Sequence, residues 1–209
     1  MTATRPTKTR GRGRPAGAGA GGTRAALLAA ARAVFSERGF AGAGIAEIVS
    51  RAGVSPPVLY HHFAGKADLY AAVAADVYDE VLGALEAAAG AAADGAPFVD
   101  RLDAVLVAAA DLNEADPTIA GFATALPADL RSSPELDAVR DEPARIRRFF
   151  VALAAAGGDI PARRRAAVAE ACTTLIAGLS RAAAADPSPA EFRRTVESLR
   201  LLVRGQLFG

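Results

Sequence analysis

Residues 40–70 read FAGAGIAEIVSRAGVSPPVLYHHFAGKADLY, and this stretch decides how the N-terminal part of the chain folds. Apolar side chains recur there at the i, i+3, i+4 and i+7 spacing of one buried helical face: Ile45, Ile48, Val49 and Ala52. Gly53 follows at the position where a left-handed residue commonly closes a helix. The pattern predicts a short helix that ends at Ala52 and a tight turn centred on Gly53.

A second short helix is predicted directly after that turn. Ser55 is a typical N-cap residue, and Pro56 suits the first helical position because its missing N–H would have no partner there. Pro57 also lacks an N–H, so we expect the Ser55 hydroxyl to cap the amide of Val58. Two short helices joined by a glycine-centred turn form a helix-turn-helix, which indicates DNA binding.

The second of these helices has two chemically different faces. Leu59 and Phe63 are four residues apart with His62 beside them, so this side is expected to face the protein interior. The opposite side carries the set expected to face DNA: Pro57, Tyr60 and His61. Val58 lies next to that set and could pack against a thymine methyl group.

The run Leu-Tyr-His-His-Phe at 59–63, followed three residues later by Lys66, resembles the TetR family of bacterial transcriptional regulators, and the likeness extends over residues 24–70. The resemblance implies an all-α protein with a three-helix DNA-binding head and a larger helical body that binds an inducer and dimerises. It also implies DNA contacts: Tyr60 and His61 to phosphates and bases, Pro57 and Val58 to bases, and Lys66 to the backbone at the start of the fourth helix. Ser55 completes the predicted DNA-binding set of this region.

One departure from the family lies just before the first helix of the pair. The family usually places Thr or Ser pairs there, whereas this chain has Ala43 and Gly44. Gly44 can still serve as an N-cap at a modest loss, so the expected fold is unchanged. A hydroxyl contact to phosphate is missing, and the N-terminal arm is the candidate replacement.

This arm, residues 1–22, is strongly basic. The first 24 residues hold six of the 24 Lys and Arg and no acid, which leaves 18 basic against 23 acidic residues in the rest of the chain. Such a Gly, Ala and Thr-rich segment cannot bury a core, so we expect it to be disordered when free. Arg12-Gly13-Arg14-Pro15 resembles the core of an AT-hook, in which Arg12 and Arg14 would enter a narrow A·T minor groove. The alternative is a basic tail that adds only non-specific attraction.

The rest of the chain shows helical periodicity without strand alternation, which predicts an all-α fold. We expect a first helix from Thr23 to Gly39 and a long fourth helix from Gly65 to about Ala89. Prolines and a Gly and Ala-rich break separate five further helices, at about 97–114, 117–126, 134–156, 162–185 and 188–207. The expected units are the arm at 1–22, a helix-turn-helix domain at 23–70, and a ligand-binding and dimerisation domain at 71–209.

The resemblance implies that the last two helices pair with their copies in a homodimer, whose two heads would read a palindromic operator in double-stranded DNA. Apolar stripes supply the predicted interface: Cys172, Leu175, Ile176, Leu179, Val196, Leu199 and Val203. The same stripes could instead pack inside one subunit. An unidentified small-molecule inducer would bind in the body, and the candidate residues are Phe98, Asn113, Phe122, Phe149, Phe150 and Thr174. Each of these could equally be a plain core or surface residue.

Other classes of function have less support in the sequence. The single cysteine, Cys172, excludes an intramolecular disulfide and suits a reducing cytoplasm, and no apolar run approaches the roughly 20 residues that span a bilayer. His61 and His62 point apart on a helix, so we expect no metal site, and neither a cofactor nor an enzyme active site is expected. Two alternatives to a ligand-responsive dimeric repressor remain: a sequence-tolerant architectural DNA binder driven by the arm, and a helical small-molecule carrier or enzyme with a vestigial head.

Overall fold

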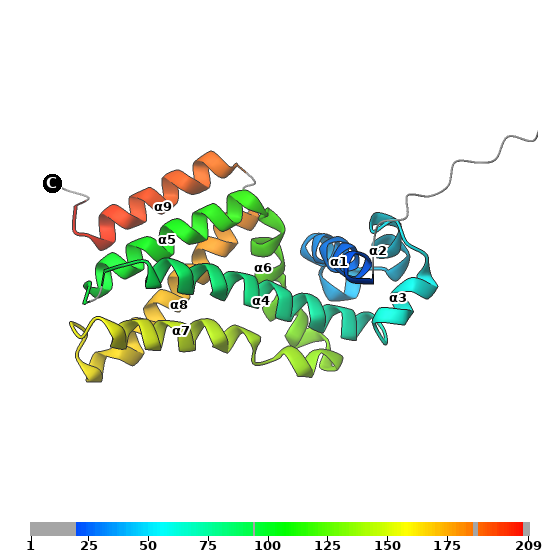
Figure 1. Cartoon of the computed structure of the whole chain (residues 1–209), viewed down its shortest axis with the longest axis horizontal. Coiled ribbons are helices and arrows are strands. Elements are labelled where there is room, and N and C mark those ends of the chain that lie inside the picture. The colour runs from blue at the N-terminus through cyan, green and yellow to red at the C-terminus, as the bar shows by residue number, and fades with distance from the viewer. Residues whose placement is uncertain (1–19, 94, 186–187, 207–209) are drawn as a thin grey trace, which may run out of the picture.

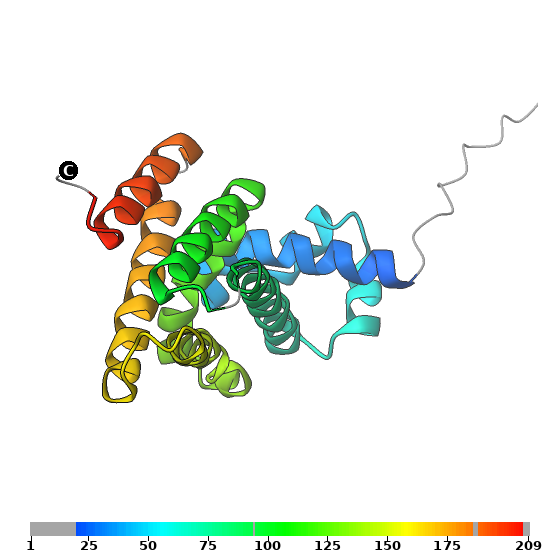
Figure 2. The same cartoon turned by 60° about the vertical axis from the view of Figure 1, so that its left-hand side comes forward.

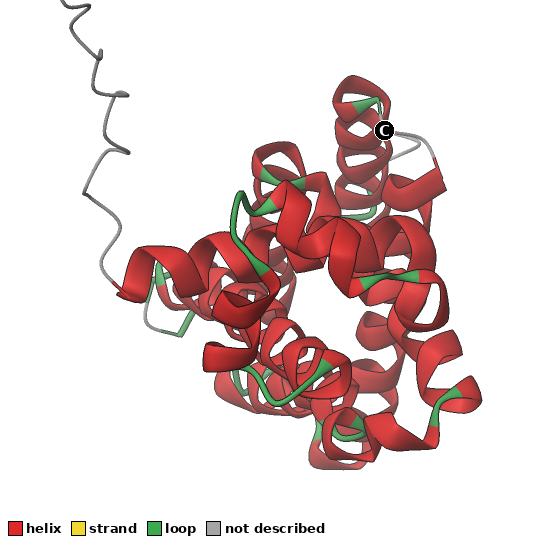
Figure 3. Ribbon diagram, turned by 90° about the vertical axis from the view of Figure 1, so that its right-hand side faces the viewer, coloured by secondary structure: helices red, strands yellow, loops and turns green. Residues whose placement is uncertain are grey.

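The computed structural model describes residues 20–93, 95–185 and 188–206, and every regular element in these ranges is helical (Figure 3). The elements are α1 (Ala20–Gly42), α2 (Ile45–Arg51), α3 (Pro56–His62), α4 (Lys66–Gly90), α5 (Phe98–Ala115), α6 (Pro117–Ser132), the 3-10 helix η1 (Pro134–Val139), α7 (Glu142–Ala156), α8 (Ala162–Ala185) and α9 (Pro189–Val203). The all-α class predicted from sequence is confirmed. None of these helices combines the length and the apolar character that crossing a membrane requires.

The helices α1, α2 and α3 form a small head at one end of the molecule, beside the start of α4 (Figure 1). The regular helix of α1 breaks at Gly39, as predicted, where φ is 63° and ψ is −178°, a conformation open essentially to glycine alone. Its start differs from the prediction, because the chain is already helical at Ala20 and Thr23 lies inside α1. No proline lies between residues 16 and 22, so every residue just before Thr23 has the backbone N–H that a helix requires, and the helix can begin earlier.

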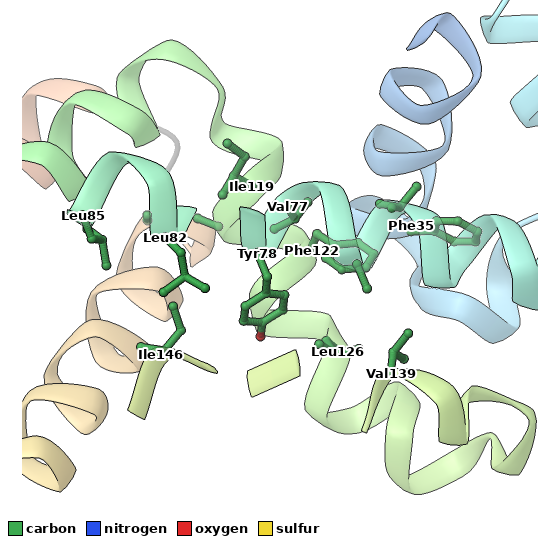
Figure 4. Close-up of a cluster of buried hydrophobic side chains, with 14 of the residues drawn as sticks. Phe35, Val77, Tyr78, Leu82, Leu85, Ile119, Phe122, Leu126, Val139 and Ile146 are labelled. Carbon is green, nitrogen blue, oxygen red and sulfur yellow. The ribbon is translucent and has the colours of Figure 1, made fainter. Parts of the chain in front are cut away.

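The long helix α4 runs from the head into the body and packs against α1, α5 and α7 (Figure 2). Val73 and Val77 follow the predicted four-residue repeat and are almost fully buried. Tyr70, one turn earlier, has its ring centroid 4.8 Å from that of Phe35 in α1 and 5.0 Å from that of Phe122 in α6. The apolar core therefore continues from the head into the body, as Figure 4 also shows.

The helix α6 is longer than predicted. Pro127 was expected to end it, but the helix continues to Ser132. The turn after the proline carries Asp129, which is buried and hydrogen-bonded to α1 and α4. Tertiary contacts thus hold this turn in helical form despite the N–H that Pro127 lacks.

Two further boundaries in the body differ from the predictions. The segment 134–156 is divided into η1 and α7, since Pro143 is tolerated in the first turn of α7 but not in the interior of a longer helix. The last helix ends at Val203 rather than 207, because the N–H groups of Gly205 and Gln206 turn back to carbonyls of the final turn. The bounds predicted for α8, 162–185, are those observed.

Candidate nucleic-acid interface and body cavity

Backbone hydrogen bonds close the turn between α2 and α3. The N–H of Gly53 donates to the carbonyl of Ser50 at 3.2 Å, and that of Val54 donates to the carbonyl of Val49 at 3.0 Å. Gly53 has a φ of 66°, the left-handed conformation predicted for this position. The turn therefore fixes the direction in which α3 leaves α2.

The start of α3 differs from the prediction in its capping. Ser55 has the extended backbone of an N-cap, but its hydroxyl makes no capping hydrogen bond, and the Val58 N–H donates to the backbone carbonyl of Ser55 at 3.0 Å instead. Pro56 and Pro57 fix φ in the first turn, which forms the helix start without help from the hydroxyl. Because Ser55 is exposed, its hydroxyl remains available to a phosphate.

The helix α3 separates its two faces as the sequence predicts. Leu59 is fully buried, and Phe63, directly after the helix, is 3% exposed. Tyr60 is 56% exposed, and Pro57 and His61 are exposed beside it. Two residues at the boundary are partly exposed: Val58 and His62. The outward face thus offers a phenol hydroxyl and an imidazole, groups that can contact phosphates and base edges.

Acidic side chains of the head are paired with arginines. Arg51 donates to the two carboxylate oxygens of Glu37 at 2.6 and 2.7 Å and to Glu47 at 3.1 Å, and Arg38 also lies 3.1 Å from Glu47. The hydrogen bond from Arg51 lowers the pKa of Glu37. Since both carboxylates are neutralised locally, the head repels a phosphate backbone less than its acid content suggests.

Lys66 is held against the head by its ammonium group. Its Nζ donates to the carbonyls of Phe40 at 2.8 Å and Ala43 at 3.1 Å, and lies 4.4 Å from the centre of the Phe40 ring. An ammonium has three N–H donors, so one remains for a phosphate. This internal role was not predictable from local sequence, because the two carbonyls lie 26 and 23 positions earlier in the chain.

A buried carboxylate in α6 connects the body to the head. Asp129 is 7% exposed, and its Oδ2 accepts the Phe40 N–H at 2.9 Å and the Tyr70 hydroxyl at 2.8 Å. Burial, and then the bond to Asp129, raise the pKa of Tyr70, so its hydroxyl stays a donor. A Cβ on Gly39 would lie 2.9 Å from Asp129 Oδ1, which shows how closely the break in α1 approaches α6. In the sequence, Asp129 stands out only as an acidic residue between Ala128 and Leu130, and this pattern does not predict its contacts with Phe40 and Tyr70.

Arg32 of α1 makes a second connection to the body. Its guanidinium lies 2.7 Å from Glu80 of α4 and also pairs with Asp116, the N-cap residue of α6. The Arg32 side chain is 13% exposed, whereas those of Glu80 and Asp116 are 44% and 29% exposed, so the pairing is only partly shielded from solvent. A movement of α6 or α4 relative to α1 would have to break these charged contacts.

The body contains a cavity of about 410 Å³ lined by residues of α4 to α9. Most of the lining is aliphatic, for example Val77, Leu112 and Ile146. Tyr78 projects from α4 toward the space between α6 and α7 (Figure 4), and burial raises its pKa to about 12, so its hydroxyl stays protonated. The volume falls within the roughly 300–1,000 Å³ typical of small-molecule sites.

The cavity lining also includes polar groups without partners. Among the residues that the structure describes, Asn113 Oδ1 and Thr124 Oγ1 are buried and accept or donate no hydrogen bond. Arg131 of α6 and Arg181 of α8 belong to the same lining, which contains no described Asp or Glu. The cavity is therefore mainly apolar, with a few hydrogen-bonding groups and positive charge.

Among the six residues predicted to bind a ligand, Asn113 lines this cavity. The other five lie outside its lining: Phe98, Phe122, Phe149, Phe150 and Thr174. Phe122 is fully buried against Tyr70 in the core, and Thr174 is exposed although the preceding Thr173 lines the cavity. Three of the four predicted phenylalanines, Phe98, Phe122 and Phe150, are buried in the core, and Phe149 packs against it, whereas the cavity wall is mostly aliphatic.

The predicted dimer stripe divides into two sets in the single subunit. Three members are buried within the subunit: Cys172, Leu179 and Val196. Four are partly buried: Leu175, Ile176, Leu199 and Val203. Leu201 and Leu202 at the end of α9 are 44% and 53% exposed, although the stripe did not include them. Arg12 and Arg14 of the arm lie outside the described residues.

Known proteins resemble the chain at two levels. Residues 27–73 match the tetR family of bacterial regulatory proteins. Over 50 residues the chain is 58% identical to the HTH-type transcriptional activator FasR of Mycolicibacterium smegmatis (strain ATCC 700084 / mc(2)155); this match covers 24% of the chain and 23% of FasR, less than a quarter of either protein.

Two solved structures share the fold over most of the chain. A TetR-family transcriptional regulator from Streptomyces coelicolor has 25% identity, with a TM-score of 0.68 over 88% of this chain and 94% of that one. GusR from Salmonella enterica also has 25% identity, with a TM-score of 0.66 over 88% of this chain and 95% of that one. Residues 27–73 therefore resemble bacterial regulatory proteins of the tetR family, and most of the chain has the fold of a solved TetR-family transcriptional regulator.

Proposed function

We propose that the chain is a homodimeric regulator that binds a two-fold symmetric DNA operator through α3 and changes its operator affinity when a small molecule occupies the body cavity. The outward face of α3 carries this proposal, because Pro57, Tyr60 and His61 are exposed on a helix whose direction the Gly53 turn fixes. A helix presented in this way is the part of a helix-turn-helix that enters the major groove.

Each candidate on the head has a role in this complex. Tyr60 and His61 contact phosphates and base edges, and Pro57 and Val58 lie against bases. The Ser55 hydroxyl and the third proton of Lys66 bind phosphates. Arg12 and Arg14 of the arm enter an adjacent minor groove.

The two heads are brought to one operator by pairing α8 and α9 with their copies. Leu201 and Leu202 support this part of the proposal, because adjacent exposed leucines on a helix are an unfavourable surface for a free subunit. We assign Leu175 and Leu199, both partly buried, to the same interface. The buried Cys172 backs the interface from inside the subunit.

The cavity is proposed to act on the head through α6. Thr124 and Arg131 line the cavity, whereas Asp129 on the other side of the helix holds Phe40 and Tyr70. A ligand alters operator affinity only if it binds one arrangement of the head more tightly than the other. The helix-turn-helix domain at 23–70 and the body at 71–209 would therefore move as linked units.

Repression, relieved by the ligand, is the proposed direction of regulation. FasR, the relative matched over less than a quarter of its length, is named an activator. A reporter gene placed behind the selected operator distinguishes the two directions, because a repressor lowers its transcription and an activator raises it.

The proposal is tested by selecting bound sequences from a random DNA pool with full-length protein at near-physiological salt. We expect enrichment of a two-fold symmetric motif. Enrichment of A·T-rich DNA without symmetry would instead support an architectural binder driven by the arm, and no enrichment would support a small-molecule carrier.

Tyr60→Ala connects the selected operator to α3. We expect it to weaken operator binding by about tenfold or more while thermal stability stays unchanged, since Tyr60 is exposed. Arg148→Ala, an exposed change on α7, is the matched control and should leave both quantities unchanged. A large loss of stability in Tyr60→Ala would contradict its assignment to the DNA-facing side.

A further inference from the structure

The wall of the body cavity is mainly hydrocarbon. Aliphatic side chains come to it from four different helices: Val77, Val81, Leu85, Ile119, Ile146 and Ile176. Removing apolar surface from water favours a ligand whose own body is hydrocarbon. Hydrocarbon alone does not distinguish one apolar ligand from another, so the polar groups of the wall set the ligand class.

One stripe of α6 brings polar groups to this wall. Thr124, Ala128 and Arg131 line the cavity at the i, i+4 and i+7 spacing of a single helical face. Thr124 Oγ1 is buried and has no hydrogen-bond partner among the described residues. Pro127 has no N–H, so the carbonyl of Ala123, which also lines the cavity, lacks the donor that a regular helix supplies.

The helix α5 adds a buried amide. Asn113 is 9% exposed and lines the cavity, and its Oδ1 has no hydrogen-bond partner in the part of the chain that the structure describes. A carbonyl oxygen only accepts hydrogen bonds, so its partner must carry an O–H or N–H group. Leaving such an acceptor buried and unpaired is unfavourable, and a ligand donor would remove that cost.

Arginines supply the charge of the wall. Arg131 and Arg181 line the cavity, neither forms a salt bridge with a described carboxylate, and none of the described lining residues is acidic. Both arginines are exposed residues, so they lie where the cavity meets solvent. Arg131 lies on the same face of α6 as Thr124, so it is better placed than Arg181 to bind a ligand that also reaches the interior of the cavity. A guanidinium in such a position binds a carboxylate, sulfonate or phosphate group through paired N–H donors.

We propose that the ligand is an amphipathic anion, with an apolar body inside the cavity, an anionic group on Arg131 at its edge, and a hydroxyl or N–H group that donates to Asn113 in its interior. This assignment refines the proposed function, on which it rests, by naming the class of the ligand. It also gives the ligand a route to the head, because Arg131 is two residues from Asp129, which holds Phe40 and Tyr70.

The charge requirement is tested with probes that share one alkyl chain. Decanoate, 1-decanol and decylammonium are titrated into the full-length protein by calorimetry, below the solubility limit of 1-decanol and below the concentrations at which the two charged probes form micelles. We expect decanoate to bind about tenfold or more tightly than 1-decanol, and decylammonium to bind least. Equal binding of decanoate and decanol, tighter binding of decylammonium, or no binding of any probe would overturn the proposal.

Two variants locate the polar contacts. Arg131→Gln should remove the preference for decanoate over decanol, whereas Arg148→Gln, an arginine outside the cavity lining, should retain it. For the donor, 10-hydroxydecanoate should bind more tightly than decanoate to the unmodified protein, and Asn113→Leu should abolish that difference. If Arg131→Gln still prefers decanoate to decanol, the contact with Arg131 is refuted. If Asn113→Leu still prefers 10-hydroxydecanoate to decanoate, the contact with Asn113 is refuted.

Failure of the ligand assignment is separable from failure of the proposed function. If decanoate binds through Arg131 but operator affinity is unchanged at saturation, the ligand class stands and the regulatory coupling is refuted. If the selected operator binds normally and no anionic probe prefers the cavity, the DNA-binding proposal stands and the ligand class is refuted.

Discussion

Replacing Asp129 by alanine should destabilise the protein far more than a surface substitution. The change removes the acceptor of two buried donors, the Phe40 N–H at 2.9 Å and the Tyr70 hydroxyl at 2.8 Å. Tyr70 is fully buried, and Asp129 is 7% exposed, so water replaces the carboxylate poorly. Each orphaned donor costs about 1–3 kcal/mol, and together they should lower the free energy of unfolding by about 2–5 kcal/mol. That is a large part of the roughly 5–15 kcal/mol that holds a typical domain folded.

The measurement is urea unfolding followed by far-ultraviolet circular dichroism, with Tyr70→Phe and the double variant measured beside Asp129→Ala. Tyr70→Phe removes one donor and leaves the bond to Phe40, so it should cost less than Asp129→Ala. The two effects should not add, because Asp129→Ala no longer leaves a hydroxyl unpaired once Tyr70 is phenylalanine. A loss below about 1 kcal/mol, or strict additivity, would refute the view that Asp129 is the shared acceptor.

Three further predictions address backbone strain, pH and salt. Gly39→Ala should lower stability by about 1–3 kcal/mol from its φ of 63° alone, before the added Cβ meets Asp129 Oδ1 at 2.9 Å, and thermal unfolding would show it; an unchanged midpoint would contradict it. Hydrogen bonds from Arg200 and Arg204 lower the pKa of Asp103 from 3.8 to about 2, so about 2 kcal/mol of stability present above pH 4 should be lost as the pH falls toward 2, and Asp103→Asn should flatten that part of the profile. Lys66→Ala should lower the slope of log affinity for the operator against log salt concentration by about one per subunit. An unchanged slope would mean that Lys66 contacts no phosphate and only bonds to the carbonyls of Phe40 and Ala43.

Residues that fix backbone geometry made the head predictable from sequence. Gly53, Pro56 and Gly65 mark helix ends by restricting or widening φ, and each lies at the boundary that the structure shows. The errors in the body have the same origin. Pro127 was expected to end α6, but buried contacts of the next turn prevail over it. Pro143, which the prediction placed inside a helix over 134–156, lies instead in the first turn of α7. A proline's local effect is readable from sequence, but the tertiary contacts that override it are not.

The α3 face was predictable from sequence, but the residues that line the cavity were not. Which face of α3 points outward follows from the spacing of Leu59 and Phe63, because these two apolar side chains lie on one side of the helix and are both buried. The cavity depends on how six helices cross, and no spacing within one helix determines that crossing. The helix α6 connects the cavity to the head. Arg131 lines the cavity, and Asp129, two residues earlier, accepts the Phe40 N–H of the head, so the two side chains lie on opposite sides of one helical turn. A ligand that moves this turn must therefore act on both surfaces at once, since a helix displaces as a rigid body before its hydrogen bonds break.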